Sequence, residues 1–234
     1  MTYVMSDLHG CYELYMEMLE KIGFSDDDTL YILGDVADRG DGPIDIYMDM
    51  MERKNVIPLL GNHDQRMRLL TAKYYFGSIK DMLELADKDE YMKSWTADGG
   101  GRTMIQYLTL TAEEKERLQE YMDGFSPCAV VTAGGNTFFL SHTAPSKSDM
   151  EDISKCDVND FTWGNIEYGK RYFEDGFLVT GHTPTVFFGK EYRGKIYKAN
   201  GHIDIDCGAF FTGTLGCLCL DTMEEFYVHD KSKE

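Results

Sequence analysis

Three short polar motifs, each directly after a short apolar run, constrain the fold of this chain most strongly. The motifs are Asp7-Leu8-His9-Gly10, Gly34-Asp35-Val36-Ala37-Asp38-Arg39-Gly40 and Gly61-Asn62-His63-Asp64. The runs before them cover residues 2–5, 29–33 and 56–60 and have the length and composition of buried strands. Carboxylate, imidazole and amide groups are thus placed at strand ends, where α/β sheets build their active sites.

Between these strands, residues 11–22 and 43–53 have helical patterns, so the first third alternates strand and helix. Further helices are expected at 64–85, 103–108 and 112–123, with a loop at 95–101. The second half predicts mainly antiparallel strands at 128–132, 137–140, 177–180, 194–199, 202–206, 213–220 and 225–229. We therefore expect one α/β domain over residues 1–234, a four-layer α/β/β/α sandwich of two mixed sheets with a helical insert at about 64–123.

Charge and hydropathy exclude some partners. The 41 acidic and 23 basic residues give a formal net charge of −18, which argues against nucleic acid as a partner. No apolar run approaches the roughly 18 residues of a membrane span, and the first ten residues lack the apolar region of a signal peptide. We expect a cytoplasmic protein that binds no membrane.

Each motif also has a simpler interpretation when it is read alone. Asp7 and His9 lie two residues apart in extended chain and point the same way, but such a pair is often just exposed. Asp35, Asp38 and Arg39 could form only a local ion pair, and Asn62 could merely cap a helix.

Two later histidines extend the pattern, because His142 and His182 also follow apolar runs, at 137–140 and 177–180. Mixed carboxylate and imidazole ligands suit Mn, Fe or Zn better than Ca. Together, the five motifs favour a metal site.

In order and spacing, these motifs resemble the phosphoprotein phosphatase family of calcineurin-like metallophosphoesterases, from about residue 3 to residue 220. Trp95, Asp98-Gly99-Gly100 and Thr103 are similar to a W…NGG…T segment of the bacterial branch, which contains serine/threonine protein phosphatases and diadenosine tetraphosphatases. The resemblance implies the four-layer metallophosphoesterase sandwich and two divalent cations, with Mn preferred and Fe or Zn as alternatives.

The resemblance also implies a role for each motif residue. Asp7, His9 and Asp35 would hold one metal, and Asp35, Asn62, His142 and His182 the other. A metal-activated hydroxide would attack phosphorus, Arg39 would bind a phosphoryl oxygen, and His63, oriented by Asp38, would protonate the leaving oxygen. Asp64 would support the ligands without binding metal.

One departure concerns phosphate binding. Bacterial relatives commonly carry Trp-x-Arg where this chain has Trp163-Gly164-Asn165, so a second phosphate-binding arginine is missing there. Arg171 and Arg102 are the candidates to replace it.

Three functions remain open from the sequence. The leading hypothesis is a serine/threonine protein phosphatase that acts on phosphorylated proteins. Hydrolysis of diadenosine tetraphosphate is the alternative, and it needs an aromatic residue to stack on adenine, for which Trp95, Trp163 and Phe187 are candidates. A catalytically silent scaffold that binds phosphorylated partners is a distant third.

Overall fold

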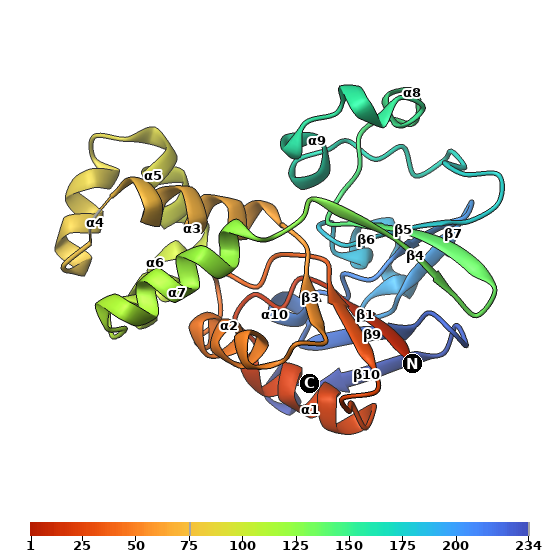
Figure 1. Cartoon of the computed structure of the whole chain (residues 1–234), viewed down its shortest axis with the longest axis horizontal. Helices are drawn as coiled ribbons and strands as arrows, with labels where there is room; N and C mark the ends of the chain where they lie inside the picture. The colour runs from red at the N-terminus through yellow and green to blue at the C-terminus, as the bar shows by residue number, and fades with distance from the viewer. Residues whose placement is uncertain (75, 234) are drawn as a thin grey trace.

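Strand β1 lies at the centre of the first of two five-stranded sheets in the computed structural model, which describes residues 1–74 and 76–233 (Figure 1). The strand order is β10-β9-β1-β2-β3. These strands span Glu225–His229, Thr214–Cys219, Thr2–Met5, Thr29–Ile32 and Val56–Pro58. Because β1, β2 and β3 are parallel, their polar motifs all emerge at the same edge.

The second sheet has the order β4-β5-β6-β8-β7. These strands span Cys128–Ala133, Asn136–Ser141, Phe177–Thr180, His202–Asp204 and Tyr197–Ala199. Strand β6 is parallel to both β5 and β8, so the expectation of mainly antiparallel strands was wrong for these pairs. The parallel pairing places the carboxyl ends of β5 and β6, and with them His142 and His182, at one edge.

Successive side chains of a strand point to opposite faces of its sheet, and this alternation creates the separate layers. Tyr3 and Met5 pack toward helices α1 (Tyr12–Lys21) and α2 (Pro43–Glu52), whereas Val4 faces the second sheet. Phe138 likewise faces the first sheet, and its neighbour Phe139 faces the opposite way. The expected four-layer α/β/β/α sandwich with two mixed sheets is confirmed, although the outer layer beside the second sheet is formed by short helices, among them α8 (Lys147–Met150) and α9 (Val158–Thr162).

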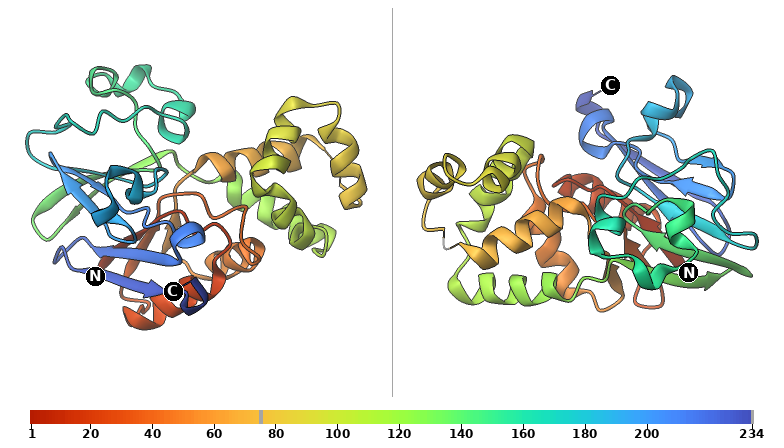
Figure 2. Two further views of the ribbon diagram at one scale, coloured as in Figure 1. Left: turned by 180° about the vertical axis from the view of Figure 1, so that it is seen from behind. Right: turned by 90° about the horizontal axis from the view of Figure 1, so that it is seen from above.

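Within the described residues, five α-helices lie between β3 and β4 in the chain and extend to one side of the sandwich (Figures 1 and 2). They are α3 (Asn62–Lys73), α4 (Ile79–Ala86), α5 (Glu90–Trp95), α6 (Gly101–Tyr107) and α7 (Ala112–Asp123). The continuous helix expected at 64–85 was wrong, because α3 ends at Lys73 and α4 starts at Ile79; residue 75 lies outside the described residues.

The loop expected at 95–101 is helical instead. A π-helical turn, Thr96–Gly100, joins α5 to α6, with a kink at Gly99, whose φ is 105°. Only glycine adopts such a φ easily, and a side chain there would collide with Arg39. The turn thereby brings Asp98 close to the Arg39 loop.

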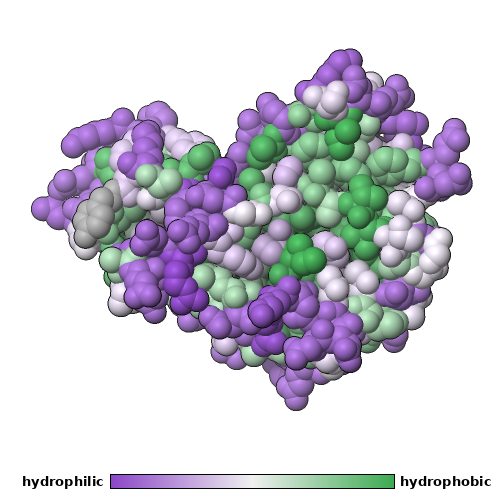
Figure 3. All heavy atoms as spheres, viewed as in Figure 1, coloured by the Kyte–Doolittle hydropathy of each residue, from purple (hydrophilic) through white to green (hydrophobic). Residues whose placement is uncertain are grey.

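A notch separates the helical insert from the segment that carries α8 and α9 (Figure 3). In this view, hydrophilic residues dominate the insert, and hydrophobic residues are more frequent over the two sheets. A further short helix, α10 (Ala209–Thr212), precedes β9. Within the described residues, the model contains no helix that combines the length and apolar character needed to span a bilayer.

Candidate metal centre

All nine residues that the sequence predicts for the site lie together at the carboxyl ends of β1, β2, β3, β5 and β6. Asp35 is at the centre: its Oδ2 atom lies 3.7 Å from His9 Nε2 and 3.4 Å from His142 Nε2. Asn62 Oδ1 lies 2.8 Å from His142 Nε2 and 3.1 Å from His182 Nδ1. These contacts bring ligand types from all five motifs into one buried site.

Two overlapping clusters of ligand atoms meet at Asp35. One is His9, Asp35 and His63, and the other is Asp35, His142 and His182; within each, the ligand atoms lie within 4.8 Å of one another. Asp7 belongs beside the first cluster, because its Oδ1 lies 3.8 Å from His9 Nε2. His63 is close to the same group, with Nε2 3.9 Å from Asp35 Oδ2.

The donor atoms suit divalent cations. His9 Nδ1 hydrogen-bonds the carbonyl of Ala37, and His142 Nδ1 hydrogen-bonds that of Leu33, so each ring turns Nε2 toward the cluster, the orientation of a metal ligand. Asp7 Oδ1 is buried and has no hydrogen-bond partner among the described residues. A cation would satisfy this oxygen, which would otherwise be costly to bury.

The electrostatics also favour positive charge at the centre. Burial raises the pKa of Asp7 to about 6, whereas the neighbouring histidines hold the pKa of Asp35 well below its usual range despite burial. His142 is also buried, but Asp35 and Asp7 raise its pKa to about 10. The same negative potential that holds a proton on His142 would stabilise a metal cation.

The backbone at the centre is unusually bent. Of the eight non-glycine residues with positive φ in the described chain, six belong to the predicted site: Asp7, His9, Asp35, Asp38, Arg39 and His182. A left-handed conformation costs a non-glycine residue on the order of 1 kcal/mol. Such bends are retained where they aim side chains at a common point, which is typical of functional sites.

Close contacts with aspartate side chains explain why two positions near the centre are occupied by glycine. A Cβ atom on Gly61 would lie 2.2 Å from Asp35 Oδ1, and one on Gly181 would lie 2.1 Å from Asp7 Oδ2. Both distances are far below van der Waals contact. Glycine at these positions lets the backbone approach the carboxylates closely.

Asp64 holds the Asp35 loop in place without facing the cluster. Its carboxylate accepts hydrogen bonds from the backbone N–H groups of Asp35, Val36, Ala37 and Gly61 at 2.7–3.2 Å, and from the hydroxyl of Tyr47. A carboxylate with five donors is well compensated for its complete burial.

His63 and Asp38 form a second buried unit beside the clusters. His63 Nδ1 lies 2.7 Å from Asp38 Oδ2, and Trp95 Nε1 and Thr103 Oγ1 also donate to the Asp38 carboxylate. Burial opposes charge on His63, but Asp35 and Asp38 outweigh it and raise its pKa. Trp95 is fully buried in this role, so it is not an adenine-stacking residue.

Arg39 contacts the ring nitrogens of two site histidines. Its Nη1 is 2.6 Å from His9 Nε2, and its Nη2 is 3.0 Å from His63 Nε2. Asp98, from the π-helical turn, lies 3.4 Å from Arg39 Nη2 and 3.4 Å from His63 Nε2. The guanidinium thus places positive charge directly beside the metal-ligand atoms.

The two arginines proposed from sequence as replacements do not reach the centre. Arg102 pairs with the exposed Asp41, and Arg171 donates to the carbonyls of Phe173 and Glu174. A different arginine, Arg66, lies near the centre and pairs with Asp98. The sequence analysis missed it, although its position one turn after His63 in α3 places both residues on the same face of the helix.

Two exposed aromatic side chains flank the arginines. Trp163 is 46% exposed; its ring lies 6.5 Å from that of His182 and 5.0 Å from the Arg66 guanidinium. Phe211, which the sequence analysis missed, is 57% exposed, and Arg39 lies 5.0 Å above its ring. Phe187 is more exposed still, and the aromatic and hydrogen-bond contacts of the described residues do not connect it to the centre.

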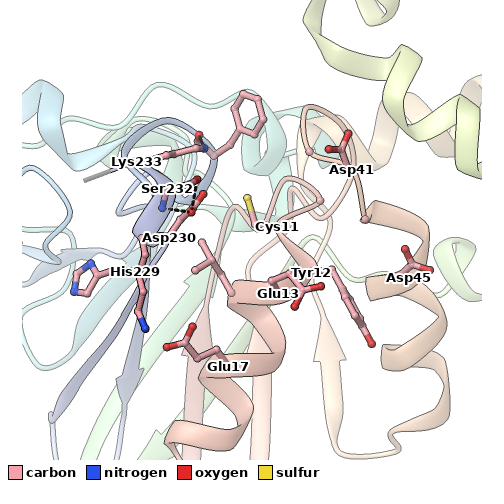
Figure 4. A pocket seen from close by; sticks show the side chains of 16 residues that line it. Cys11, Tyr12, Glu13, Glu17, Asp41, Asp45, His229, Asp230, Ser232 and Lys233 are labelled. Carbon is pink, nitrogen blue, oxygen red and sulfur yellow. Dashed lines mark hydrogen bonds between the residues drawn. The ribbon is translucent and has the colours of Figure 1, made fainter.

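A cavity of about 690 Å³ lies outside the candidate centre (Figure 4). It is formed by the starts of α1 and α2 and by the C-terminal segment, and the residues lining it include Cys11, Tyr12, Asp41, His229 and Lys233. None of the predicted metal ligands lines this cavity. It borders the site only through the backbone of Gly10 and Gly40, which follow His9 and Arg39.

Comparison with known proteins agrees with this architecture. The sequence profile of calcineurin-like phosphoesterases matches residues 2–207. A symmetrical bis(5'-nucleosyl)-tetraphosphatase of Salmonella paratyphi C is 33% identical over 132 residues, which cover 54% of this chain and 44% of that protein. The corresponding Salmonella typhimurium protein is 35% identical over 97 residues, 39% of this chain and 34% of that protein. The matched stretch thus spans less than half of these relatives.

Solved structures share the fold. A candidate diadenosine tetraphosphatase superposes with a TM-score of 0.62 at 14% identity and covers 97% of this chain and 92% of its own. A protein serine/threonine phosphatase from Saccharomyces cerevisiae gives a TM-score of 0.57 at 10% identity, over 98% of this chain and 79% of its own. With its profile match over most of the sequence, the chain belongs to the calcineurin-like phosphoesterase family, whose members act on phosphoric esters.

Proposed function

We propose that this chain hydrolyses dinucleoside tetraphosphates at a two-metal centre. The observation that carries the proposal is the pair of exposed aromatic rings, Trp163 and Phe211, beside the clustered ligands, each against an arginine. Aromatic rings stack on nucleobases, and arginines bind the phosphates between them. The names of the Salmonella relatives support the same substrate class.

Asp7, His9 and Asp35 would hold one cation, and Asp35, Asn62, His142 and His182 the other. Mn²⁺ is our first choice, with Fe or Zn as alternatives for this mixed ligand set. When bound, the two cations lower the pKa of an attacking water and offset the charge on the phosphoryl oxygens.

The side chains around the clusters supply the remaining chemistry. As a P–O bond of the anhydride breaks, His63 Nε2 would give a proton to the leaving phosphate oxygen, and Asp38 holds Nδ1 of that ring. Thr103 and Trp95 fix the Asp38 carboxylate. Arg39 would bind a phosphoryl oxygen through its planar guanidinium.

Phosphoserine and phosphothreonine proteins remain the second candidate substrates. The notch between the helical insert and the α8–α9 segment is open on the face seen in Figure 3, and an open site suits a polypeptide substrate. The catalytic residues proposed above would serve either the anhydride or the phosphomonoester.

The deciding experiment compares kcat/KM, in Mn²⁺, for diadenosine tetraphosphate and a phosphoserine peptide. We expect the dinucleotide to be preferred at least tenfold, with nucleoside diphosphate as the product seen by chromatography. Preference for the peptide would replace the proposal with protein phosphatase activity.

A further inference from the structure

Arg66 is a buried cation with unused hydrogen-bond donors. Its side chain is 3% exposed, and Nη2 donates to Asp98 Oδ2 at 3.1 Å. Its Nε and Nη1 atoms have no hydrogen-bond partner within residues 1–74 and 76–233. Buried donors are normally paired, so this guanidinium has capacity to bind a further acceptor.

Asp98 marks where that acceptor would sit. Its Oδ1 lies 3.4 Å from Arg39 Nη2, while its Oδ2 accepts from Arg66 Nη2 and lies 3.4 Å from His63 Nε2. One carboxylate therefore bridges two arginines and the proposed general acid. A phosphoryl group presents similar paired oxygens, and the 41% exposure of the Asp98 side chain leaves it room to move away.

Packing between α3 and α9 fixes the other side of Arg66. Gln65, the neighbouring residue, donates to Asn159 and accepts from Thr162, both in α9. Trp163 follows directly and lies against the Arg66 guanidinium. The arginine is thus held between an aromatic ring and the Asp98 carboxylate, which reduces the entropy it would lose on binding phosphate.

We propose that Arg66 is a second phosphate-binding residue of this centre, and that substrate phosphate displaces the Asp98 carboxylate from between Arg39 and Arg66. This assignment rests on the proposed phosphoesterase function and names the group that contacts the substrate. It also gives Asp98 a defined role as the anion that neutralises both arginines before substrate binds.

The test measures binding of inorganic phosphate to the Mn²⁺-loaded full chain by calorimetry. Loss of a charge-assisted hydrogen bond predicts that Arg66→Met weakens phosphate binding roughly 10–100-fold. Arg66→Lys keeps the charge but not the planar fork, so its affinity should be intermediate. Arg102→Met is the matched control, because its guanidinium pairs with Asp41, and it should bind phosphate like the unaltered chain.

Asp98→Asn tests the exchange in the opposite direction. With the competing carboxylate charge removed, phosphate should bind at least twofold more tightly. Phosphate binding should also change the tryptophan fluorescence of the unaltered chain, and Arg66→Met should diminish that change. These readouts do not require turnover.

The proposal is overturned if Arg66→Met binds phosphate as well as Arg102→Met, or if Asp98→Asn binds it more weakly than the unaltered chain. If Arg66→Met does not fold, by circular dichroism, Arg66→Lys and Asp98→Asn decide the matter. Phosphate binding is independent of which ester is cleaved. A phosphopeptide preference would therefore reject the dinucleotide proposal and leave this one intact.

Discussion

Asp38 and His63 form a hydrogen-bonded pair, with 2.7 Å between Oδ2 and Nδ1, and neither side chain is more than 1% exposed. A carboxylate on Nδ1 fixes the orientation of the ring and favours its protonated form. The other ring nitrogen, Nε2, faces the region where Arg39 and Asp98 meet, 3.0 Å from Arg39 Nη2 and 3.4 Å from Asp98 Oδ2. This geometry suits a residue that gives a proton to a leaving oxygen.

His63→Asn should lower kcat for diadenosine tetraphosphate by roughly 10²–10⁴-fold, the usual contribution of general acid catalysis. The loss should be much smaller for p-nitrophenyl phosphate, whose leaving group needs little protonation. Steady-state kinetics on both substrates measures the difference. Unchanged turnover of the dinucleotide would remove His63 from the mechanism.

The assignment of Asp35 to both metal sites predicts how much metal an Asp35 variant binds. Asp35 is the residue shared by both clusters, so Asp35→Asn should lower bound Mn²⁺ from about two ions per chain to less than one. Elemental analysis after dialysis gives the count, with Asp41→Asn as an exposed-carboxylate control. Chelation of metal from the unaltered chain should lower its Tm, because the ions stabilise only the folded state. Two ions retained by Asp35→Asn would contradict the assignment.

The order of the sequence motifs was sufficient to predict the sandwich and the convergence of the predicted site residues. The reason is local: each ligand follows its strand within a few residues, and parallel strands end at a common edge. Asp35 and His142 follow strands of different sheets, and they meet because the two sheets pack together with these strand ends side by side.

The surroundings of the ligands depend on long-range packing and were predicted poorly. Trp95 was expected in a loop but is buried against Asp38, because the segment that carries it is helical. Arg66 reaches the centre only through the contacts of α3 with the π-helical turn and α9. Phe211 lies in a short helix whose sequence carries no motif.

Base stacking makes a prediction that separates the two candidate substrates. Trp163→Ala and Phe211→Ala should each lower kcat/KM for diadenosine tetraphosphate by roughly 5–150-fold, the equivalent of about 1–3 kcal/mol per stacked base. Hydrolysis of p-nitrophenyl phosphate should change less than threefold.

Phe187→Ala is the matched control, since this ring is 76% exposed and no aromatic contact joins it to the centre within the described residues. Equal losses on both substrates would mean that the aromatics merely position their arginines. No loss on the dinucleotide would argue against stacking altogether.

Asp64 provides a prediction about stability that is independent of substrate. Asp64→Ala would leave four buried backbone N–H groups without their acceptor and should lower the free energy of unfolding by roughly 3–5 kcal/mol. Tyr47→Phe removes a single donor to the same carboxylate and should cost only about 1 kcal/mol. Urea unfolding in the presence of EDTA measures both without a contribution from bound metal. If Asp64→Ala were as stable as Tyr47→Phe, the Asp35 loop would not depend on this carboxylate.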